Sequence, residues 1–285
     1  MYQKFIYGTL LGAAVLFAGC SGGGNKGGIN AGNNAGNNAE SLKFQQFKDS
    51  TGVVIDDKTH YSVVIIDYPV SGSEVLVNAL KQSLVEYLNV SFDDAKDGQT
   101  LVHQGTLQRM ERVKSAATED YNEGIPFDVG YSDDTRIAKV FETEKIVTLV
   151  AGGYIFVGGP HGMPYSSGAT FRKSDGKVIS RQLLKDDAWG RIQDKVAASL
   201  RKFFHVSSNA ELYDELKADK VQYDESANTI AVPAPMSQPY VVDNEIVFCY
   251  DYEEISHNAA GMPEVSIPIK EIEQYLTPEA AELFK

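Results

Sequence analysis

The sequence predicts an α+β fold in which antiparallel sheets carry packed helices and two halves of the chain associate closely. Runs rich in β-branched residues, such as residues 60–67, come in groups and do not alternate regularly with helices. Asp-Gly and Asp-Asn pairs between short β runs are typical of antiparallel hairpins. Grouped strands followed by helices favour α+β over a doubly wound parallel sheet.

In the first half, strands lead into two helices and then into further strands. Pro69 and Gly72 end the second strand, and Ser73 is a suitable N-cap for the helix that follows it. The glycine pairs at 152–153 and 158–159 are expected to bracket a separate strand. The predicted elements are strands 42–48 and 60–67, helices 73–90 and 106–117, and strands 137–140, 145–150 and 152–157.

In the second half, two turns join pairs of short strands. One turn is Ser174-Asp175-Gly176 and the other contains Asp243-Asn244. Thr277 and Pro278 are typical of the N-cap and first turn of a last helix. The predicted elements are strands 169–171 and 177–179, helices 189–203 and 210–217, strands 240–242, 245–250 and 265–269, and the C-terminal helix.

The composition is that of an acidic globular protein. The 285 residues include 26 Lys and Arg against 39 Asp and Glu, a net charge of −13, and 43% are hydrophobic. This hydrophobic content excludes a chain that is disordered throughout. The negative charge argues against nucleic acid or an anionic lipid surface as the main partner. It permits a cationic partner, and it is also compatible with an acidic surface that only keeps the protein soluble.

The first twenty residues have the organisation of a secretory signal peptide. Lys4 precedes an uncharged stretch from Phe5 to Ala18, which is shorter than the roughly twenty residues of a membrane-spanning helix. Ala18 and Gly19 precede Cys20, so the segment resembles the lipobox of bacterial lipoproteins. The resemblance implies cleavage before Cys20 and lipid attachment there, with palmitate as a typical acyl group. A plain secretory signal with an incidental cysteine is the alternative.

A low-complexity segment separates this signal from the rest of the chain. Residues 21–39 contain seven Gly and six Asn, and Ile29 is their only large apolar residue. Such a segment is expected to act as a flexible tether. We expect four parts: a signal peptide at 1–19, a tether at 20–39, an N-terminal α+β half at 40–157 and a C-terminal half at 158–285. The protein is then an extracytoplasmic, membrane-anchored lipoprotein, and it faces the periplasm because no acidic export tag follows Cys20.

None of the short motifs forms a catalytic constellation. The glycines at 153, 158 and 159 lack the Lys and Ser/Thr of a phosphate-binding loop. Residues 92–98 resemble a calcium loop but offer too few oxygen ligands. The five histidines lack zinc-site spacing, and Cys249 reads as a buried hydrophobe. We therefore expect no enzymatic activity, no metal and no cofactor. His161, in the turn 158–164, is the histidine best placed to contact a ligand.

Several segments of the second half together form a recognisable pattern: His161-Gly-Met-Pro164, Ala169–Ile179, Leu183–Asp186, Tyr252–Gly261, Val265–Pro268 and Tyr275-Leu276. On these segments the second half resembles an extracytoplasmic domain-of-unknown-function family. The family occurs in RsiV-type anti-sigma factors and before the catalytic domain of PdaC-type peptidoglycan deacetylases, and residues 61–72 resemble the module that usually precedes it. The resemblance covers about residues 42–276.

The resemblance implies an envelope module that binds a ligand or partner, and in the anti-sigma factors the partner is lysozyme. The candidate contact residues are His161, Tyr165, His257 and Asn258. His257 and Asn258 stand where the family usually has proline and an aromatic residue. The expected partner is a lysozyme-like cationic protein or peptidoglycan. Two alternatives remain: an accessory structural lipoprotein of an envelope complex, and an envelope glycan-acting enzyme that uses His161 as acid or base.

Overall fold

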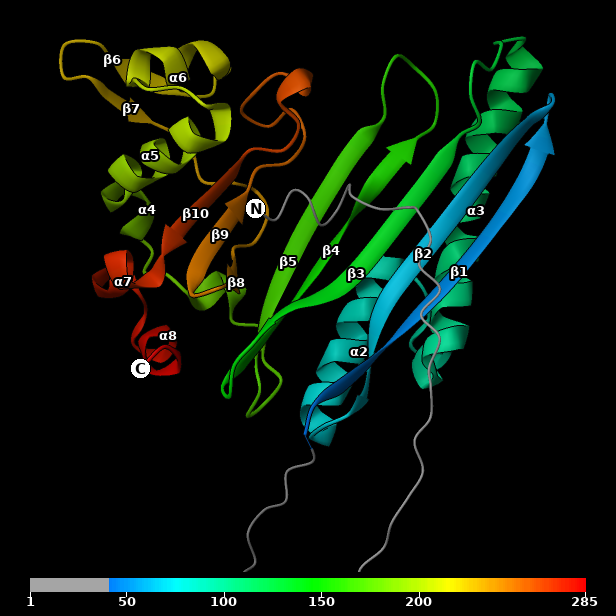
Figure 1. Ribbon diagram of the computed structural model, residues 1–285, viewed down its shortest axis with the longest axis horizontal. Helices are drawn as coiled ribbons and strands as arrows, with labels where there is room; N and C mark the ends of the chain where they lie inside the picture. Colours follow the sequence, from blue (N-terminus) through cyan, green and yellow to red (C-terminus); the bar gives the residue numbers. More distant parts are fainter. Residues whose placement is uncertain (1–40) are drawn as a thin grey trace, which may run out of the picture. The chain divides into compact units, whose positions relative to one another are not determined.

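The computed structural model describes residues 41–285, which form one compact unit. The predicted signal peptide, Cys20 and the whole predicted tether lie outside the described residues. The α+β class is confirmed, with helices and antiparallel-rich sheets packed together (Figure 1). None of the helices within residues 41–285 is long and apolar enough to cross a membrane.

A five-stranded sheet with the order β1-β2-β3-β4-β5 organises the first part of the chain. Its strands are β1 (Lys43–Ile55), β2 (Lys58–Ser71), β3 (Ser132–Glu142), β4 (Ile146–Phe156) and β5 (Met163–Arg172). Strands β2 and β3 are parallel, whereas the other neighbours are antiparallel. Because parallel neighbours need a crossover, α2 (Glu74–Leu88) and α3 (Gly98–Glu123) connect them and cover one face of the sheet (Figure 1).

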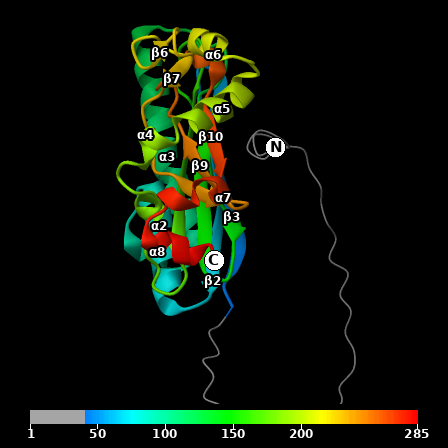
Figure 2. The same cartoon turned by 90° about the vertical axis from the view of Figure 1, so that its left-hand side faces the viewer.

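The second part of the chain adds smaller sheets and shorter helices beside β5 (Figure 1). In the side view, β9, β10 and the short helices of this part face the viewer (Figure 2). Strands β8 (Tyr240–Val242), β9 (Glu245–Cys249) and β10 (Glu264–Pro268) form an antiparallel sheet, and β6 (Gln222–Asp224) pairs with β7 (Thr229–Ala231). The α-helices of this part are α4 (Ala188–Arg191), α5 (Gln193–Phe204), α6 (Asn209–Glu215), α7 (Ile269–Ile272) and α8 (Pro278–Leu283). Short 3₁₀ turns are η1 (Phe92–Lys96), η2 (Ser180–Gln182), η3 (Asn258–Ala260) and η4 (Glu273–Tyr275).

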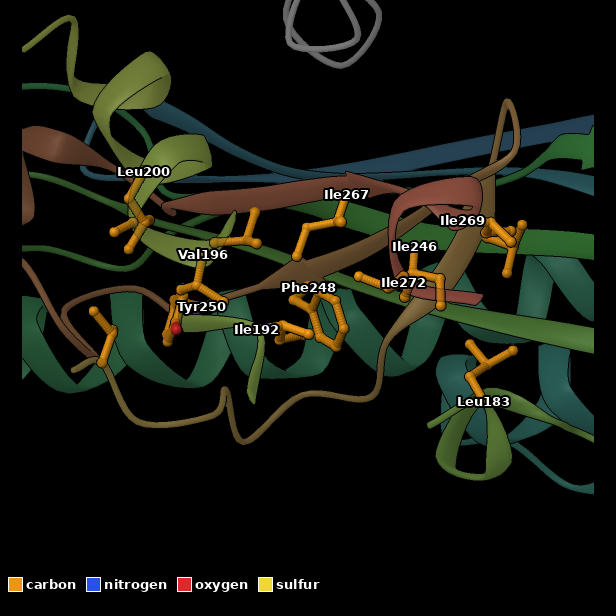
Figure 3. Close-up of a cluster of buried hydrophobic side chains, with 14 of the residues drawn as sticks. Leu183, Ile192, Val196, Leu200, Ile246, Phe248, Tyr250, Ile267, Ile269 and Ile272 are labelled. Atoms are coloured by element: carbon orange, nitrogen blue, oxygen red, sulfur yellow. The ribbon is translucent and has the colours of Figure 1, made fainter. Parts of the chain in front are cut away.

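Successive side chains of β4 point to opposite faces of the sheet, and in this way β4 joins the two parts. Val147 and Leu149 point into the core under α2, whereas Ile146 belongs to the core of the second part. On that second face, the Thr148 hydroxyl donates to the carbonyl of Val241 in β8 at 2.7 Å. The second core is built from α5, β9 and β10, with Val196, Phe248 and Ile267 among its members (Figure 3). The sheet therefore supports helices on one face and the smaller sheet on the other.

The expected break at Gly152-Gly153 does not occur. Strand β4 runs without interruption from Ile146 to Phe156, and both glycines stay in register with β5. At Gly153 a Cβ atom would lie 2.6 Å from the hydroxyl of Tyr165. The glycine is thus required for close approach of a neighbouring side chain, and its role is not to end a strand.

Two helices differ from the predicted ranges. Helix α3 begins eight residues earlier than expected, because the Asp97 carboxylate accepts a hydrogen bond from the Thr100 N–H at 2.8 Å. The predicted helix 189–203 is divided at the buried Ile192 into α4 and α5. The predicted strand 177–179 does not form, and Val178 makes only an isolated bridge with Phe171. The turn and cap predicted farther along are confirmed: Asp243 and Asn244 both have positive φ between β8 and β9, and Thr277 caps α8 through the Ala280 N–H.

The five-stranded sheet spans the expected boundary between the two halves. The boundary expected between residues 157 and 158 lies in the loop between β4 and β5. Strand β5 follows that boundary, yet it belongs to the same sheet as β4. Cys249 is buried at the end of β9, as the sequence indicated, and burial raises the pKa of its thiol to about 12. The free cysteine is therefore a protonated core residue at neutral pH.

A buried arginine ties α2, α3 and β3 together. The Arg109 guanidinium donates to the carbonyls of Leu88 and Tyr87 at 3.1 and 3.0 Å, and so bonds the C-terminal end of α2. Its Nε donates to the Thr135 hydroxyl at 2.5 Å and lies 3.7 Å from Asp133. Burial raises the pKa of Asp133, although the positive charges of Arg109 and Arg112 oppose that shift. The guanidinium thus neutralises a buried carboxylate and satisfies helix-end carbonyls.

We predict that Arg109→Met lowers the free energy of unfolding by about 3–5 kcal/mol, because Asp133 is left buried without its main positive partner. Urea denaturation monitored by circular dichroism measures the loss. Arg112→Met is the matched control, since its side chain is 53% exposed and lies 3.6 Å from the same carboxylate. The control is expected to lose less than about 1 kcal/mol. Equal losses for the two variants would contradict the assignment.

Candidate functional site

Two loops that are far apart in the sequence meet at His161. The first, residues 157–162, connects β4 to β5, and the second, residues 250–263, connects β9 to β10. The Asn258 amide nitrogen lies 2.7 Å from Nε2 of His161, and the Tyr252 hydroxyl lies 3.1 Å from Nδ1. These three side chains form what we call the two-loop site.

Glycines shape the first loop. Gly158 and Gly159 have φ of +101° and +80°, which L side chains rarely adopt. A Cβ atom at Gly158 would lie 2.6 Å from the hydroxyl of Tyr131. At the other end of the loop, the Gly162 N–H donates to the hydroxyl of Tyr154 at 2.9 Å. Both ends of the loop are thereby fixed, and His161 is presented between them on the surface.

One carboxylate organises the second loop. Glu254 accepts hydrogen bonds from the Asp251 N–H at 2.7 Å and from the Met236 N–H at 2.9 Å. The loop then continues through η3 and leaves it at Gly261, where φ is +73°. Because its carboxylate already accepts two backbone N–H groups, Glu254 has a structural role in positioning Tyr252 and Asn258.

The hydrogen bonds of His161 define its tautomer. The amide of Asn258 donates to Nε2, so Nδ1 carries the ring proton and donates to the Tyr252 hydroxyl. The rings of His161 and Tyr252 meet edge-to-face at 6.1 Å. Desolvation and the negative charge of Glu253 raise the pKa of Tyr252, which keeps its hydroxyl protonated. The site presents an imidazole and a phenol at an acidic loop.

The four contact residues expected from the sequence fall in two places. His161 and Asn258 are in direct contact, and His257 is exposed next to Asn258 at the start of η3. Tyr165 is on the helix-covered face of the sheet, where its hydroxyl bonds the Thr135 hydroxyl. Burial raises the pKa of Tyr165. Its place is therefore in the polar cluster around Arg109.

Sequence reasoning missed two tyrosines at the two-loop site. Tyr252 contacts His161 directly, and Tyr154 holds the loop that carries His161. Tyr252 stands in the segment that resembles the known family, so that segment contained the relevant signal. Tyr154 follows the Gly152-Gly153 pair, whose interpretation as a strand boundary obscured its role.

The described residues do not supply a metal cluster at this site. No group of three or more His, Cys, Asp and Glu side chains within residues 41–285 is arranged to hold a metal ion. A cavity of about 350 Å³ lies against the β8–β9 turn, with Lys270, Glu273 and Phe284 in its lining. Because His161 is exposed, the two-loop site is a surface feature, suited to contact with a ligand or another macromolecule.

Comparisons with known proteins identify the fold. A member of the DUF3298 family from Bacteroides fragilis matches 85% of this chain and 97% of its own, at a TM-score of 0.65 and 15% identity. A DUF3298 family protein from Pseudomonas aeruginosa PAO1 covers the same shares at a TM-score of 0.54 and 12% identity. The fold resembles that of DUF3298 proteins. No family model matches the sequence, and no curated protein matches it.

The support beneath the first loop is sensitive to alkaline pH. The Tyr131 hydroxyl donates to the Asp120 carboxylate, directly under Gly158. Burial first, and then this carboxylate, raise the pKa of Tyr131 to about 12. Because the folded-state value lies above the ordinary value of 10, the stability from this group is complete below pH 10. It is lost as the pH rises towards about 12.

We predict that Tyr131→Phe changes how stability depends on pH between 10 and 12. At pH 9 the variant is less stable than the wild type by about 1 kcal/mol, because it lacks the hydrogen bond to Asp120. As the pH rises to 12 the difference shrinks, since only the wild type loses a proton at this position. Urea denaturation of both proteins across this range tests the prediction. A difference that stays constant to pH 12 would contradict the assignment.

Proposed function

We propose that this protein is a non-enzymatic, lipid-anchored binding module of the bacterial cell envelope, of the RsiV/PdaC type. Its contact surface is the two-loop site, and its anchor is the acylated Cys20. The observation that carries the proposal is the direct contact of His161 with Asn258, which joins two loops from distant parts of the sequence. Side chains that are already held in place lose less conformational entropy when a partner binds. Such a contact therefore suits a preformed recognition surface.

The engagement of both His161 nitrogens supports a contact role over a catalytic one. General acid–base catalysis needs an imidazole poised to exchange a proton with substrate, commonly oriented by a carboxylate. Here Nδ1 faces a phenol and Nε2 faces an amide, and the imidazole lies on an exposed loop. These neighbours orient the ring and occupy both of its nitrogens. They favour an imidazole that contributes shape and hydrogen bonds to a complex.

The charge around the site supports a cationic partner. The second loop contains Asp251, Glu253 and Glu254, and the whole sequence has a net charge of −13. Long-range attraction steers a basic protein towards such a surface and increases the association rate. A lysozyme-like protein is therefore the favoured partner, and peptidoglycan is the second ligand to test.

We predict saturable binding of lysozyme to the fragment 40–285 by calorimetry, at both about 0.15 M and about 0.5 M salt. Asn258→Ala and His257→Ala are expected to weaken that binding by about tenfold, because Asn258 belongs to the two-loop site and His257 is exposed beside it. His103→Ala is the matched control, since His103 is an exposed histidine on α3 that pairs with Asp49. The control is expected to bind as the wild type does.

Three outcomes would count against a lysozyme receptor. Binding that disappears at about 0.5 M salt would indicate only non-specific attraction between an acidic and a basic protein. Equal weakening by His103→Ala would separate binding from the two-loop site. Absence of binding at both salt concentrations would leave peptidoglycan, which a pull-down with insoluble cell-wall material tests on the same variants.

We predict that Cys20→Ser releases the full chain from the membrane fraction of a bacterial host. Two or more acyl chains give stable anchoring, so removal of the attachment point is expected to move the protein into the soluble extracytoplasmic fraction. Cell fractionation and immunoblotting measure the distribution. Cys249→Ser is the matched control, because that cysteine is buried in β9. Retention of the Cys20→Ser variant in the membrane fraction would contradict the lipoprotein assignment.

A further inference from the structure

The interior between the sheet and its helices is divided into two hydrophobic clusters. The proximal cluster includes Val64, Leu84 and Leu149 and lies under α2. The distal cluster consists of Met110, Val113, Ala117, Phe127 and Tyr131, with partly buried residues from the ends of β1 and β4. The distal cluster lies towards the end of the sheet where β4 passes into the His161 loop (Figure 1).

Polar residues separate the two clusters on three elements, β2, β3 and α3. On β2, Ser62 lies between the distal His60 and the proximal Val64, and all three are fully buried. On β3, Asp133 and Thr135 precede the proximal Ile137. On α3, Arg109 separates the proximal Val102 from the distal Met110. We call Ser62, Arg109, Asp133 and Thr135 the polar seam.

The polar seam is a weak joint because two of its buried atoms lack hydrogen-bond partners, although one of them, Oδ2 of Asp133, lies 3.6 Å from the Arg112 guanidinium. Ser62 and Asp133 are paired in register on β2 and β3, and they are 0% and 1% exposed. Neither the Ser62 hydroxyl nor Oδ2 of Asp133 has a hydrogen-bond partner among residues 41–285. Burying such atoms is unfavourable, and separation of the two clusters at this place would hydrate both of them.

The distal side of the seam is held together by its own contacts. The backbone N–H of Tyr131 donates to Nδ1 of His60 at 3.0 Å, and the Tyr61 N–H donates to the Tyr131 carbonyl at 2.9 Å. Edge-to-face ring contacts connect His60 to Phe127 at 4.9 Å and Tyr131 to Phe156 at 5.6 Å. These contacts join β2 and β4 to residues 127–131, which follow α3, and the distal cluster adds α3 itself through Val113, so this end is expected to move as one body. We call it the distal unit: residues 53–61, 110–131 and 156–157.

The His161 loop connects the distal unit to the second part of the chain. At its start, Gly158 packs against the Tyr131 hydroxyl and the Asp120 carboxylate of the distal unit. Three residues later, His161 bonds Asn258 and Tyr252, which belong to the β9–β10 loop. The contact of His161 with Asn258 therefore connects the loop that packs on the distal unit to the β9–β10 loop.

We propose that the distal unit opens and closes independently of the proximal core, and that the His161–Asn258 contact is the latch that holds it closed. The opening separates the two clusters at the polar seam, and the β9–β10 loop remains folded. If the two-loop site binds a ligand as proposed above, then ligand binding and opening are linked, because they use the same side chains. The independent opening itself requires no ligand.

Hydrogen exchange of the full chain in mild detergent, followed by mass spectrometry of peptides, tests the independence of the distal unit. Leu84→Ala removes a fully buried side chain from the proximal cluster. It is expected to speed exchange in α2 and β4 about 30-fold or more and to leave exchange in residues 110–131 unchanged. Val113→Ala destabilises the distal cluster. It is expected to speed exchange in residues 110–131 and also in α2 and β4, because global unfolding, through which α2 and β4 exchange, opens the distal unit as well.

The asymmetry between these two variants is the decisive result. A similar acceleration of residues 110–131 and of β4 by Leu84→Ala would overturn the proposal, since both clusters would then open only in one transition. This measurement uses the unliganded protein. Its result is therefore independent of whether lysozyme or peptidoglycan binds, and failure of the proposed function would leave it unaffected.

The latch is tested on the same protein without a ligand. Asn258→Ala removes one hydrogen bond from His161 and is expected to speed exchange in residues 110–131 about 3- to 10-fold, with α2 and β9 unchanged. Asn78→Ala, at an exposed position on α2, is the matched control and is expected to change neither region. Unchanged exchange in residues 110–131 of Asn258→Ala would overturn the assignment of the latch.

Discussion

The buried guanidinium of Arg109 is the constraint on which the arrangement of the first sheet and its helices depends. It bonds the last carbonyls of α2, sits beside Asp133 and bonds Thr135 on β3, so one side chain fixes three elements. A parallel β2–β3 pair requires its crossover helices to return to the sheet at a defined position. The pair of Arg109 and Asp133 fixes that position, but it also places polar atoms within the core. Those atoms also divide the core into its proximal and distal clusters.

The position of β5 follows from this arrangement, and the two-loop site follows from β5. Tyr165 on β5 reaches Thr135 only because Gly153 on the neighbouring strand has no side chain. The loop before β5 is then held between Tyr131 of the distal unit and Tyr154 of β4, which leaves His161 facing the β9–β10 loop. The same framework connects core packing, the exposed recognition surface and the motion proposed for the distal unit.

The sequence predicted the class of fold and the β8–β9 hairpin, because β-branched runs and turn residues are local signals. Of the hairpin predicted at residues 174–176 only an isolated bridge between Phe171 and Val178 forms. The sequence did not predict the parallel β2–β3 pair, since the choice of neighbour is made by long-range packing of α2 and α3. Gly153 shows a similar limit of sequence-based prediction. A glycine can mark the end of a strand, and it can also make room for a neighbouring side chain, as Gly153 does for Tyr165. His161 and Asn258 were predicted from a family resemblance, and they are in contact. Tyr252 was overlooked because its role depends on a loop from the other part of the chain.

The central claim is that the two-loop site is the surface that contacts the partner, and histidine-selective nuclear magnetic resonance tests it most directly. With ¹⁵N-labelled histidines in the protein and unlabelled lysozyme added, the ring signals of all five histidines are followed separately. The account predicts that His161 and His257 shift on binding, with His161 starting as the Nδ1–H tautomer, while the buried His60 and the distant His103 stay unchanged. Shifts at His103 with none at His161 would contradict it.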